Sequence, residues 1–519
     1  MADQHTILKS TDFRSILFPG TDAPTLNETE PACFHDLNLD QIVATLTGGR
    51  DDYQLEPIFY TSLSSAQHVQ YRQQIYTDLA RKDVHAHATA FAQAMTTHRG
   101  RLAQLPKLHA ARQKEFWLLS AMLTYQHAVR DFTNALEGDE LDSDGMRGLR
   151  DWLHGYVTGP KFTQLAEQGE KIRAELDAIR FTMLLDGLKV TVTPYENEAD
   201  YSAEVEATFE RFRQGEVKEH LVRFPSYLWL DTVEENVLTL VAKANPEQFA
   251  ALDQYVRSNQ DSYLDPIVAE TDRALQFYLS YLEHTERITA SGLSFTTPRV
   301  TADKAARADD IFDLALAGKL VAEKKPVVTN SFHLEENERV IVVTGANQGG
   351  KTTFSRTFGQ LHWLANLGLP VPGTDAALFL FDQLFTHYEK EEDITTLHGK
   401  LEDELVRIHN ILQAATSDSI IVMNEIFNST TLDDAILLGT AVLKEIIQRD
   451  ILALCVTFID ELTTLSDTTV SMVAAVDPHE PANRTFKLER RPADGLAYAV
   501  ALAEKYELTH DQLSERIAS

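Results

Sequence analysis

Apolar residues recur at helical spacing through the front of the chain, from about residue 38 onward. Two stretches, 116–136 and 162–179, carry apolar residues mostly at steps of three, four and seven. Such spacing predicts helices with one face buried against a partner, and we interpret both stripes as helix core. The positions are Phe116, Leu119, Leu123, Val129, Phe132 and Leu136 in the first stretch, and Phe162, Leu165, Ile172, Leu176 and Ile179 in the second.

A short alternating pattern interrupts the helices at 182–193. Val190 and Val192 alternate with polar residues, and Asp186-Gly187 favours a tight turn. The sequence therefore predicts a small β-hairpin inserted in a helical region. Helical patterns then resume, and a polar stretch at 296–303 marks a joint.

After Lys325 short β-rich runs alternate with helical segments. The runs read PVVTN, RVIVVTG, SIIVMNE, LALCVTF and TVSMVAAV. This alternation predicts a mainly parallel sheet. The expected fold class is α plus α/β: an N-terminal extension over 1–32, a mostly helical domain over 33–303 with the hairpin at 182–193, and an α/β domain over 304–519 that ends in helices.

The acidic charge and the low cysteine content disfavour several classes of protein. The 519 residues carry a formal net charge of −31, and the parts before and after Lys325 are both acidic. Because non-specific duplex binding depends on Lys and Arg that neutralise phosphates, this balance disfavours a broad nucleic-acid surface. The sequence shows no membrane-spanning run, no secretory signal and only two distant cysteines. We therefore expect a cytoplasmic protein with no membrane association and no structural zinc.

The run VIVVTGANQGGKTTFSRTFG contains the phosphate-binding pattern G-x-x-x-x-G-K-[ST]. A predicted strand precedes it and a predicted helix follows, which is the context that a P-loop needs and that a chance glycine-rich turn lacks. Backbone N–H groups of such a loop hold phosphate oxygens. Lys351 would contact the β and γ phosphates of ATP, and the Thr352 hydroxyl would hold Mg²⁺. The candidate nucleotide-binding residues are Gly345, Ala346, Asn347, Gln348, Gly349, Gly350, Lys351, Thr352 and Thr353.

A second motif, SIIVMNEIFNSTTLDD, ends a buried strand in Asn424-Glu425. P-loop ATPases usually have Asp and then Glu at this point, the Asp for the Mg²⁺ shell and the Glu for the attacking water. Asn424 can still accept from a metal-bound water but adds no charge. Glu425 is the candidate catalytic residue. The alternative is an ordinary core strand that ends in polar residues.

These motifs resemble those of the MutS family of DNA mismatch-repair ATPases. TGANQGGKTTFSR is similar to the family's T-G-P-N-M-G-G-K-S-T block, and MNEIFNSTTLDDA is similar to its D-E-hydrophobic-G-R-G-T-S-T-F-D-G, one residue shorter. KPVVTNSFHL resembles the segment before the P-loop strand and places Asn330 on the family's Asn. The resemblance is specific over 327–519 and looser ahead of it.

The resemblance implies a helical core and lever domain followed by an ABC-like P-loop ATPase domain, with ATP and Mg²⁺ as cofactors. It also implies a homodimer in which each site takes its P-loop from one subunit and a hydroxyl signature from the other. Ser429, Thr430 and Thr431 would supply that signature in trans. Helix N-capping is the alternative role for these residues, and the two roles are compatible.

Three departures from the family qualify this expectation. Asn424 replaces the family's Asp, and Phe458 stands where the family has a His that senses the γ-phosphate, so any ATPase should be weak. His387, in a THY sequence, comes too early in the chain for that role, and we interpret it as a loop residue near the site. The front of the chain has no room for the family's mismatch-reading and connector domains. A DNA clamp could only be the small element at 183–193.

Two main hypotheses remain open. The first is a dimeric, ATP-driven switch or clamp that binds mismatched or branched DNA in DNA repair and hydrolyses ATP slowly. The second is a nucleotide-gated protein-interaction scaffold without direct nucleic-acid contact, which the acidic charge favours. A metabolic kinase is a poorer third hypothesis, because the signature after Glu425 suits an ATPase site shared between subunits.

Overall fold

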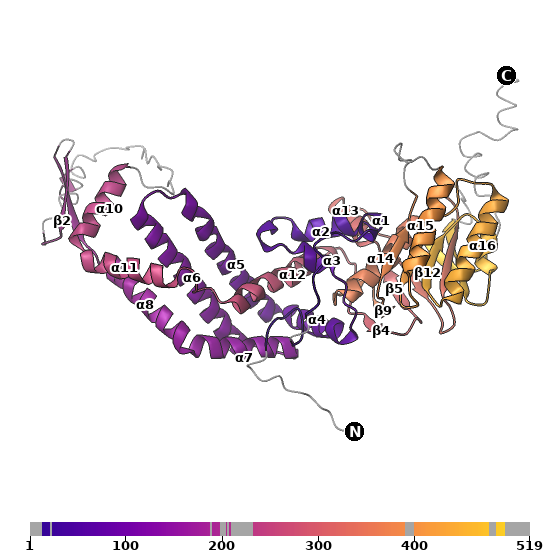
Figure 1. Ribbon diagram of the computed structural model, residues 1–519, viewed down its shortest axis with the longest axis horizontal. Helices are drawn as coiled ribbons and strands as arrows, with labels where there is room; N and C mark the ends of the chain where they lie inside the picture. The colour runs from indigo at the N-terminus through magenta and orange to yellow at the C-terminus, as the bar shows by residue number, and fades with distance from the viewer. Residues whose placement is uncertain are drawn as a thin grey trace, which may run out of the picture. The chain divides into compact units, whose positions relative to one another are not determined.

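The computed structural model describes residues 13–20, 23–186, 189–197, 204, 207–208, 232–389, 399–476 and 484–493. The chain divides into two compact units, whose elements are labelled in Figure 1. The first unit consists of Met1–Lys82, Leu141–Arg147 and Arg273–Ser519, and the second of Asp83–Glu140 and Gly148–Asp272. Both units are discontinuous in sequence, whereas the predicted domain ranges are continuous. The predicted C-terminal helices lie outside the described residues.

Long helices form most of the second unit, as the apolar stripes predict. The first stripe lies on α6 and the second on α8, except Ile179, which follows the end of α8. Both helices pack against α11, and the Tyr255 hydroxyl of α11 donates to the Leu165 carbonyl of α8 at 3.0 Å. Within the described ranges, no helix is long and apolar enough to cross a bilayer. The helices lying wholly or partly in this unit are α5 (Lys82–Gln104), α6 (Ala111–Gly138), α7 (Asp144–Thr158), α8 (Pro160–Asp177), α10 (Thr232–Ala244), α11 (Pro246–Asn259) and α12 (Pro266–Thr289).

The predicted hairpin is confirmed. Strands β1 (Phe181–Asp186) and β2 (Lys189–Pro194) pair antiparallel, with Asp186 opposite Lys189. Gly187, in the predicted turn, lies outside the described residues. Helix α10 contacts β2.

A six-stranded sheet organises the back of the first unit, in the order β10-β11-β12-β7-β13-β14. Its first five strands are parallel and β14 runs antiparallel to β13. Four of the five predicted β-rich runs are strands of this sheet, and their nearly continuous apolar character suits parallel strands that are buried on both faces. The strands are β7 (Val340–Gly345), β10 (Leu384–His387), β11 (Ile420–Asn424), β12 (Leu452–Val456), β13 (Thr469–Val476) and β14 (Arg484–Arg490).

The fifth run, PVVTN, was wrongly predicted as a strand. Strand β6 begins only at Asn330, and Pro326, Val327 and Val328 lie before it and line a cavity. β6 (Asn330–His333) belongs to a four-stranded sheet with β4 (Arg299–Thr301), β9 (Asp375–Phe379) and β5 (Arg307–Ile311), in the order β4-β9-β5-β6. A short pair joins β3 (Phe295–Thr296) and β8 (Val371–Pro372).

Helix α14 (Lys351–Asn366) lies between the six-stranded sheet and the helices at the front of the chain. It contacts β7, β11 and β12, and also α1. The Gln360 amide donates to the Leu37 carbonyl at 2.8 Å, and the Trp363 indole donates to the Phe59 carbonyl at 3.0 Å. A Cβ on Gly359 would lie 2.6 Å from a terminal methyl group of Leu37, so a larger residue there would displace the Leu37 side chain. Distant segments therefore hold α14 in place.

The remaining helices of the first unit surround these sheets. They are α1 (Cys33–Leu37), α2 (Leu39–Thr47), α3 (Glu56–Tyr60), α4 (Ala66–Leu79), α13 (Leu314–Ala322), α15 (Lys400–Ala414) and α16 (Leu432–Gln448). Short 3₁₀ turns are found at Asp51–Tyr53 and Asp460–Thr464, and at Leu105–Lys107 in the second unit.

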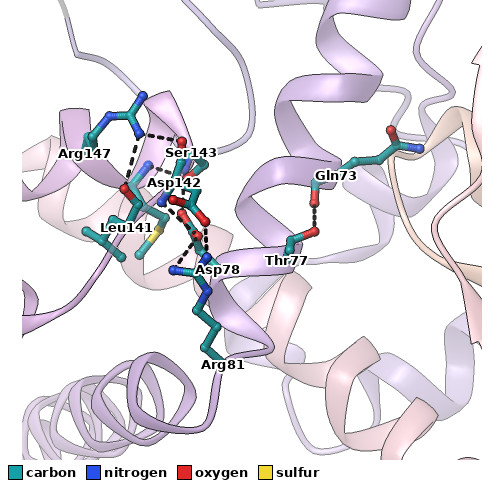
Figure 2. A network of polar contacts seen from close by, with 9 residues as sticks. Gln73, Thr77, Asp78, Arg81, Leu141, Asp142, Ser143 and Arg147 are labelled. Carbon is teal, nitrogen blue, oxygen red and sulfur yellow. Dashed lines mark hydrogen bonds and ion pairs between the residues drawn. The ribbon is translucent and has the colours of Figure 1, made fainter.

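The segment Leu141–Arg147 joins two stretches of the second unit, yet it is part of the first. The buried Asp78 carboxylate of α4 accepts the Asp142 N–H at 3.1 Å and the Ser143 N–H at 2.8 Å. Arg81 lies 3.6 Å from the same carboxylate and also pairs with Asp142. Figure 2 shows these contacts converging on Asp78. One carboxylate therefore fixes this segment against α4.

Candidate functional site

The loop after β7 turns at two glycines with left-handed backbone angles. Residues 340–343 of β7 are fully buried, and the chain then turns at Gly345, whose φ is 106°. A Cβ there would lie 2.9 Å from the Ala474 backbone nitrogen. Gly350, with φ 93°, is the N-cap of α14. Glycine is required at both positions because L side chains rarely adopt such angles.

Lys351 turns back into the loop. It is 5% exposed, and its ammonium donates to the Gly345 carbonyl at 2.9 Å and the Ala346 carbonyl at 3.1 Å, with the Asn347 amide oxygen at 3.4 Å. Burial lowers the pKa of Lys351, while Glu425 nearby raises it. The Lys351 ammonium is thus held by three oxygen atoms of the loop, next to the N-terminus of α14. The dipole of a helix favours anions at its N-terminus.

A cavity of about 570 Å³ opens at this loop, within the range of small-molecule sites. Its lining combines polar loop residues and Glu425 with apolar side chains from α13, from the segment before β6 and from β14, which we call the apolar wall. The polar lining includes Gln348, Gly350, Lys351, Thr352, Thr353 and Glu425, and the apolar wall includes Leu316, Leu320, Pro326, Val327, Val328 and Phe486.

Asn330, the first residue of β6, lines the same cavity. Its amide nitrogen donates to the Phe486 carbonyl at 3.1 Å, and its amide oxygen accepts the Leu488 N–H at 2.8 Å. Both ends of the amide are therefore used to tie β6 to β14. Asn330 fixes Phe486, which forms part of the apolar wall.

Asn424 and Glu425 lie at the carboxyl end of β11, which β12 separates from β7 in the same sheet. Asn424 is 7% exposed, and its amide oxygen has no hydrogen-bond partner among the residues that the structure describes. Glu425 adopts a left-handed φ of 56°, and its N–H donates to the Val456 carbonyl at 2.8 Å. The side chain of Glu425 faces the cavity. Two predicted residues of separate motifs are thus brought together with the loop.

The three signature hydroxyls are engaged within the chain. Ser429 donates to Glu404 at 2.9 Å, while Thr430 and Thr431 donate to Asp434 at 3.4 and 2.9 Å. Thr431 is the N-cap of α16, where its hydroxyl also accepts the Asp434 N–H. The helix-capping role is confirmed for Thr431, and a role of the three hydroxyls across a subunit interface stays a prediction.

His387 was wrongly interpreted as a loop residue. It is the last residue of β10, pairs with Met423 of β11 and is 1% exposed. Its Nε2 atom lies 3.8 Å from a Glu404 carboxylate oxygen. Phe458, which follows β12, is 51% exposed. His387 is therefore a buried residue at the same sheet edge as the loop.

The part of the chain that contains this site is similar to known proteins. The family model described as MutS domain V matches residues 341–507. A DNA mismatch repair protein MutS of Brevibacillus brevis is 32% identical over 155 residues, which cover 30% of this chain and 18% of that protein. Residues 341–507 are therefore similar to domain V of MutS proteins. The MutS protein of Thermotoga maritima is 30% identical over 138 residues, which cover 27% of this chain and 17% of that protein. The MutS protein of Thermotoga neapolitana is 30% identical over 172 residues, which cover 33% of this chain and 21% of that protein. The matches thus span about a fifth of each of these relatives.

The cavity has a feature that the motifs in the sequence did not indicate. The apolar wall comes from α13, the segment before β6 and β14, none of which carries a phosphate motif. The only sequence signal was the apolar run PVV beside the predicted Asn330. Glu404 was also missed, because a carboxylate inside a helix has no distinguishing pattern.

The residues present fit a magnesium ion that arrives with a nucleotide. Thr352 lines the cavity, and the buried Asn424 oxygen is without a partner in the described part of the chain. No group of three or more His, Cys, Asp or Glu able to hold a metal is found among the described residues. Mg²⁺ usually binds through one or two protein oxygens plus substrate phosphates and water, so this donor set suits it without a dedicated protein cage.

Proposed function

We propose that this MutS-like chain binds ATP with Mg²⁺ at the loop 345–353 and hydrolyses it slowly, as the engine of a dimeric switch or clamp that acts on mismatched or branched DNA in repair. The observation that carries the proposal is the cavity in which the buried Lys351 cation, the N-terminus of α14 and Glu425 meet. The cation and the oriented N–H groups suit a triphosphate. The apolar wall suits a base and ribose.

Each polar residue has a role in this proposal. Lys351 exchanges its loop carbonyl acceptors for β and γ phosphate oxygens, a charge-assisted contact. Thr352, and Asn424 through a water, would hold the Mg²⁺, which neutralises charge on the phosphates. Glu425 orients the attacking water. Turnover is slow because Asn424 brings no charge and Phe458 offers no proton donor to the phosphate.

Nucleotide binding is tested with Lys351→Ala. Binding of a fluorescent ATP analogue with Mg²⁺ should fall by about 100-fold or more, as expected for the loss of a charge-assisted contact of about 3 kcal/mol. The exposed Lys444 of α16 supplies a matched control, Lys444→Ala, which should bind like the parent protein. Equal affinity in Lys351→Ala and Lys444→Ala would refute the assignment of the loop.

Hydrolysis is tested with Glu425→Gln. The variant should retain nucleotide affinity while the rate of phosphate release falls by about 100-fold, since orientation of the water is lost. Undiminished turnover would remove Glu425 from the reaction.

The alternative, a nucleotide-gated scaffold, is favoured by the net charge of −31. Homoduplex, mismatched and branched DNA should be titrated with and without ATP over a range of salt concentrations. Binding by the switch should depend on ATP and weaken as salt rises, because phosphate contacts release counterions. Failure to bind any of the three DNAs at low salt, together with intact ATP binding, would support the scaffold.

A further inference from the structure

The loop 425–431 between β11 and α16 carries both the candidate catalytic residue and the signature hydroxyls. Its backbone is in left-handed conformations at Glu425, with φ 56°, and at Phe427, with φ 58°. Residues other than glycine adopt such angles only where the surroundings impose them. Phe427 is fully buried, so the loop cannot relax without exposing an aromatic ring. Something outside the loop must therefore maintain its shape.

Glu404 of α15 supplies that constraint. It is 5% exposed, and its Oε2 atom accepts the Ser429 hydroxyl at 2.9 Å. Its carboxylate also accepts the backbone N–H of Phe427, and Oε1 faces His387 Nε2 at 3.8 Å. Burial raises the pKa of Glu404, but the contacts with His387, Ser429 and Phe427 outweigh burial and leave the pKa below its ordinary value. Glu404 is thus an anion at neutral pH that holds the loop at two points.

Glu404 reaches the nucleotide site only through this loop. The described residues that line the cavity include Glu425 but not Glu404. A second carboxylate, Glu389, accepts the Asn428 amide at 2.9 Å from the exposed side of the loop. Glu404 differs from Glu389 because it is buried and because it contacts the backbone of the loop.

We propose that Glu404 is a positioning residue of the ATPase site: through Phe427 and Ser429 it sets the loop conformation that aims Glu425 into the cavity and presents the signature hydroxyls. This inference rests on the proposed ATPase function. Ser429 has one hydroxyl proton, which it donates in a hydrogen bond to Glu404. Ser429 can therefore donate to a phosphate only after it leaves Glu404, so the same carboxylate also determines when the signature is available.

The test compares Glu404→Ala and Glu404→Gln with Glu402→Gln, which changes an exposed carboxylate of the same helix. In Glu404→Ala, kcat for ATP should fall by about 10- to 100-fold, the scale of an effect caused by misplacing a catalytic group. KM and the affinity for a fluorescent ATP analogue should stay within about threefold, because Glu404 does not line the cavity. Glu404→Gln should recover at least about a third of the parent kcat, since an amide oxygen can accept from both Ser429 and Phe427.

Amide hydrogen exchange measures how well the conformation of the loop 425–431 is held, and the measurement does not require ATPase activity. Peptides that cover 425–431 should exchange about tenfold faster in Glu404→Ala than in the parent or in Glu402→Gln, which corresponds to the loss of one hydrogen bond of about 1.4 kcal/mol. A kcat within twofold of the parent, or loop exchange equal to that of the control, would overturn the positioning role. A fall in kcat matched by an equal fall in nucleotide affinity would also overturn it, because that pattern indicates a binding residue. If the parent protein neither binds nor hydrolyses ATP, the proposed function fails, whereas the exchange comparison still decides whether Glu404 holds the loop.

Discussion

Removing the Asp78 carboxylate should loosen the segment Leu141–Arg147 from the first unit. Asp78 is fully buried and accepts two backbone N–H groups, those of Asp142 and Ser143. The Asp78→Ala side chain can accept neither. Both donors would lose a charge-assisted partner, and the Ser143 N–H lies where water does not replace it. The segment should therefore become the first part of this unit to open.

The magnitude follows from the contacts. Each backbone donor left without its partner costs about 1–3 kcal/mol. The ion pair with Arg81 adds less than about 1 kcal/mol, because Arg81 is 36% exposed and regains water. We therefore expect Asp78→Ala to lower the free energy of unfolding by about 3 kcal/mol. Asp78→Asn retains one acceptor, so it should lose about half as much.

Urea unfolding followed by pulse hydrogen exchange and mass spectrometry reports a midpoint for the peptides of each unit. The matched control is Asp142→Asn, which removes the exposed partner of Arg81 and leaves both backbone bonds intact. The control should change stability by less than about 1 kcal/mol. A midpoint shift in Asp78→Ala no larger than in Asp142→Asn would refute the reasoning, because it would mean that the two buried N–H bonds contribute nothing.

Two further outcomes are expected. Burial lowers the pKa of His362 to about 4, below the value of about 6.5 in the unfolded chain. Between these two pH values the unfolded chain binds a proton that the folded protein does not. The free energy of unfolding should therefore be highest above pH 6.5 and should fall as the pH drops toward 4. Urea midpoints should show the parent losing about 2 kcal/mol more than His362→Phe between pH 7 and pH 5; parallel losses would contradict this. Asn424→Asp should raise Mg²⁺-dependent ATP turnover several-fold and lower the melting temperature of the nucleotide-free protein, because it adds an anion at a buried site. Unchanged turnover at saturating Mg²⁺ would show that Asn424 does not contact the metal shell.

The sheet was predictable because its strands are buried on both faces. β7 and β11 each combine at least four consecutive apolar residues with turn-forming or polar residues at the carboxyl end. In parallel strands those ends share one edge. The sequence therefore predicts that the turn at Gly345 and the residue Asn424 lie at the same edge of the sheet. The same logic failed for PVVTN, because a cavity wall and a strand both need apolar side chains.

The grouping of the front helices with the sheet was not predictable from periodicity. A stripe shows that a helix face is buried, but it does not identify what covers that face. Leu37 and Gln360 are more than 300 residues apart in the sequence, yet the Gln360 amide donates to the Leu37 carbonyl. The two compact units follow such long-range contacts, whereas the predicted ranges follow changes of pattern along the chain.

The signature shows the limit of reasoning from residue type. Ser429, Thr430 and Thr431 have the chemistry to donate to a phosphate, and the sequence could say no more. The structure shows each hydroxyl already donating to a carboxylate of its own chain. Exchanging a carboxylate acceptor for a phosphate oxygen keeps a charge-assisted bond for the hydroxyl, but the buried Glu404 carboxylate would lose the hydrogen bond from Ser429. The hydroxyls are thus held in place by acceptors that a second anion can replace, and the strength of Glu404 and Asp434 as acceptors sets how readily a partner's triphosphate could capture them.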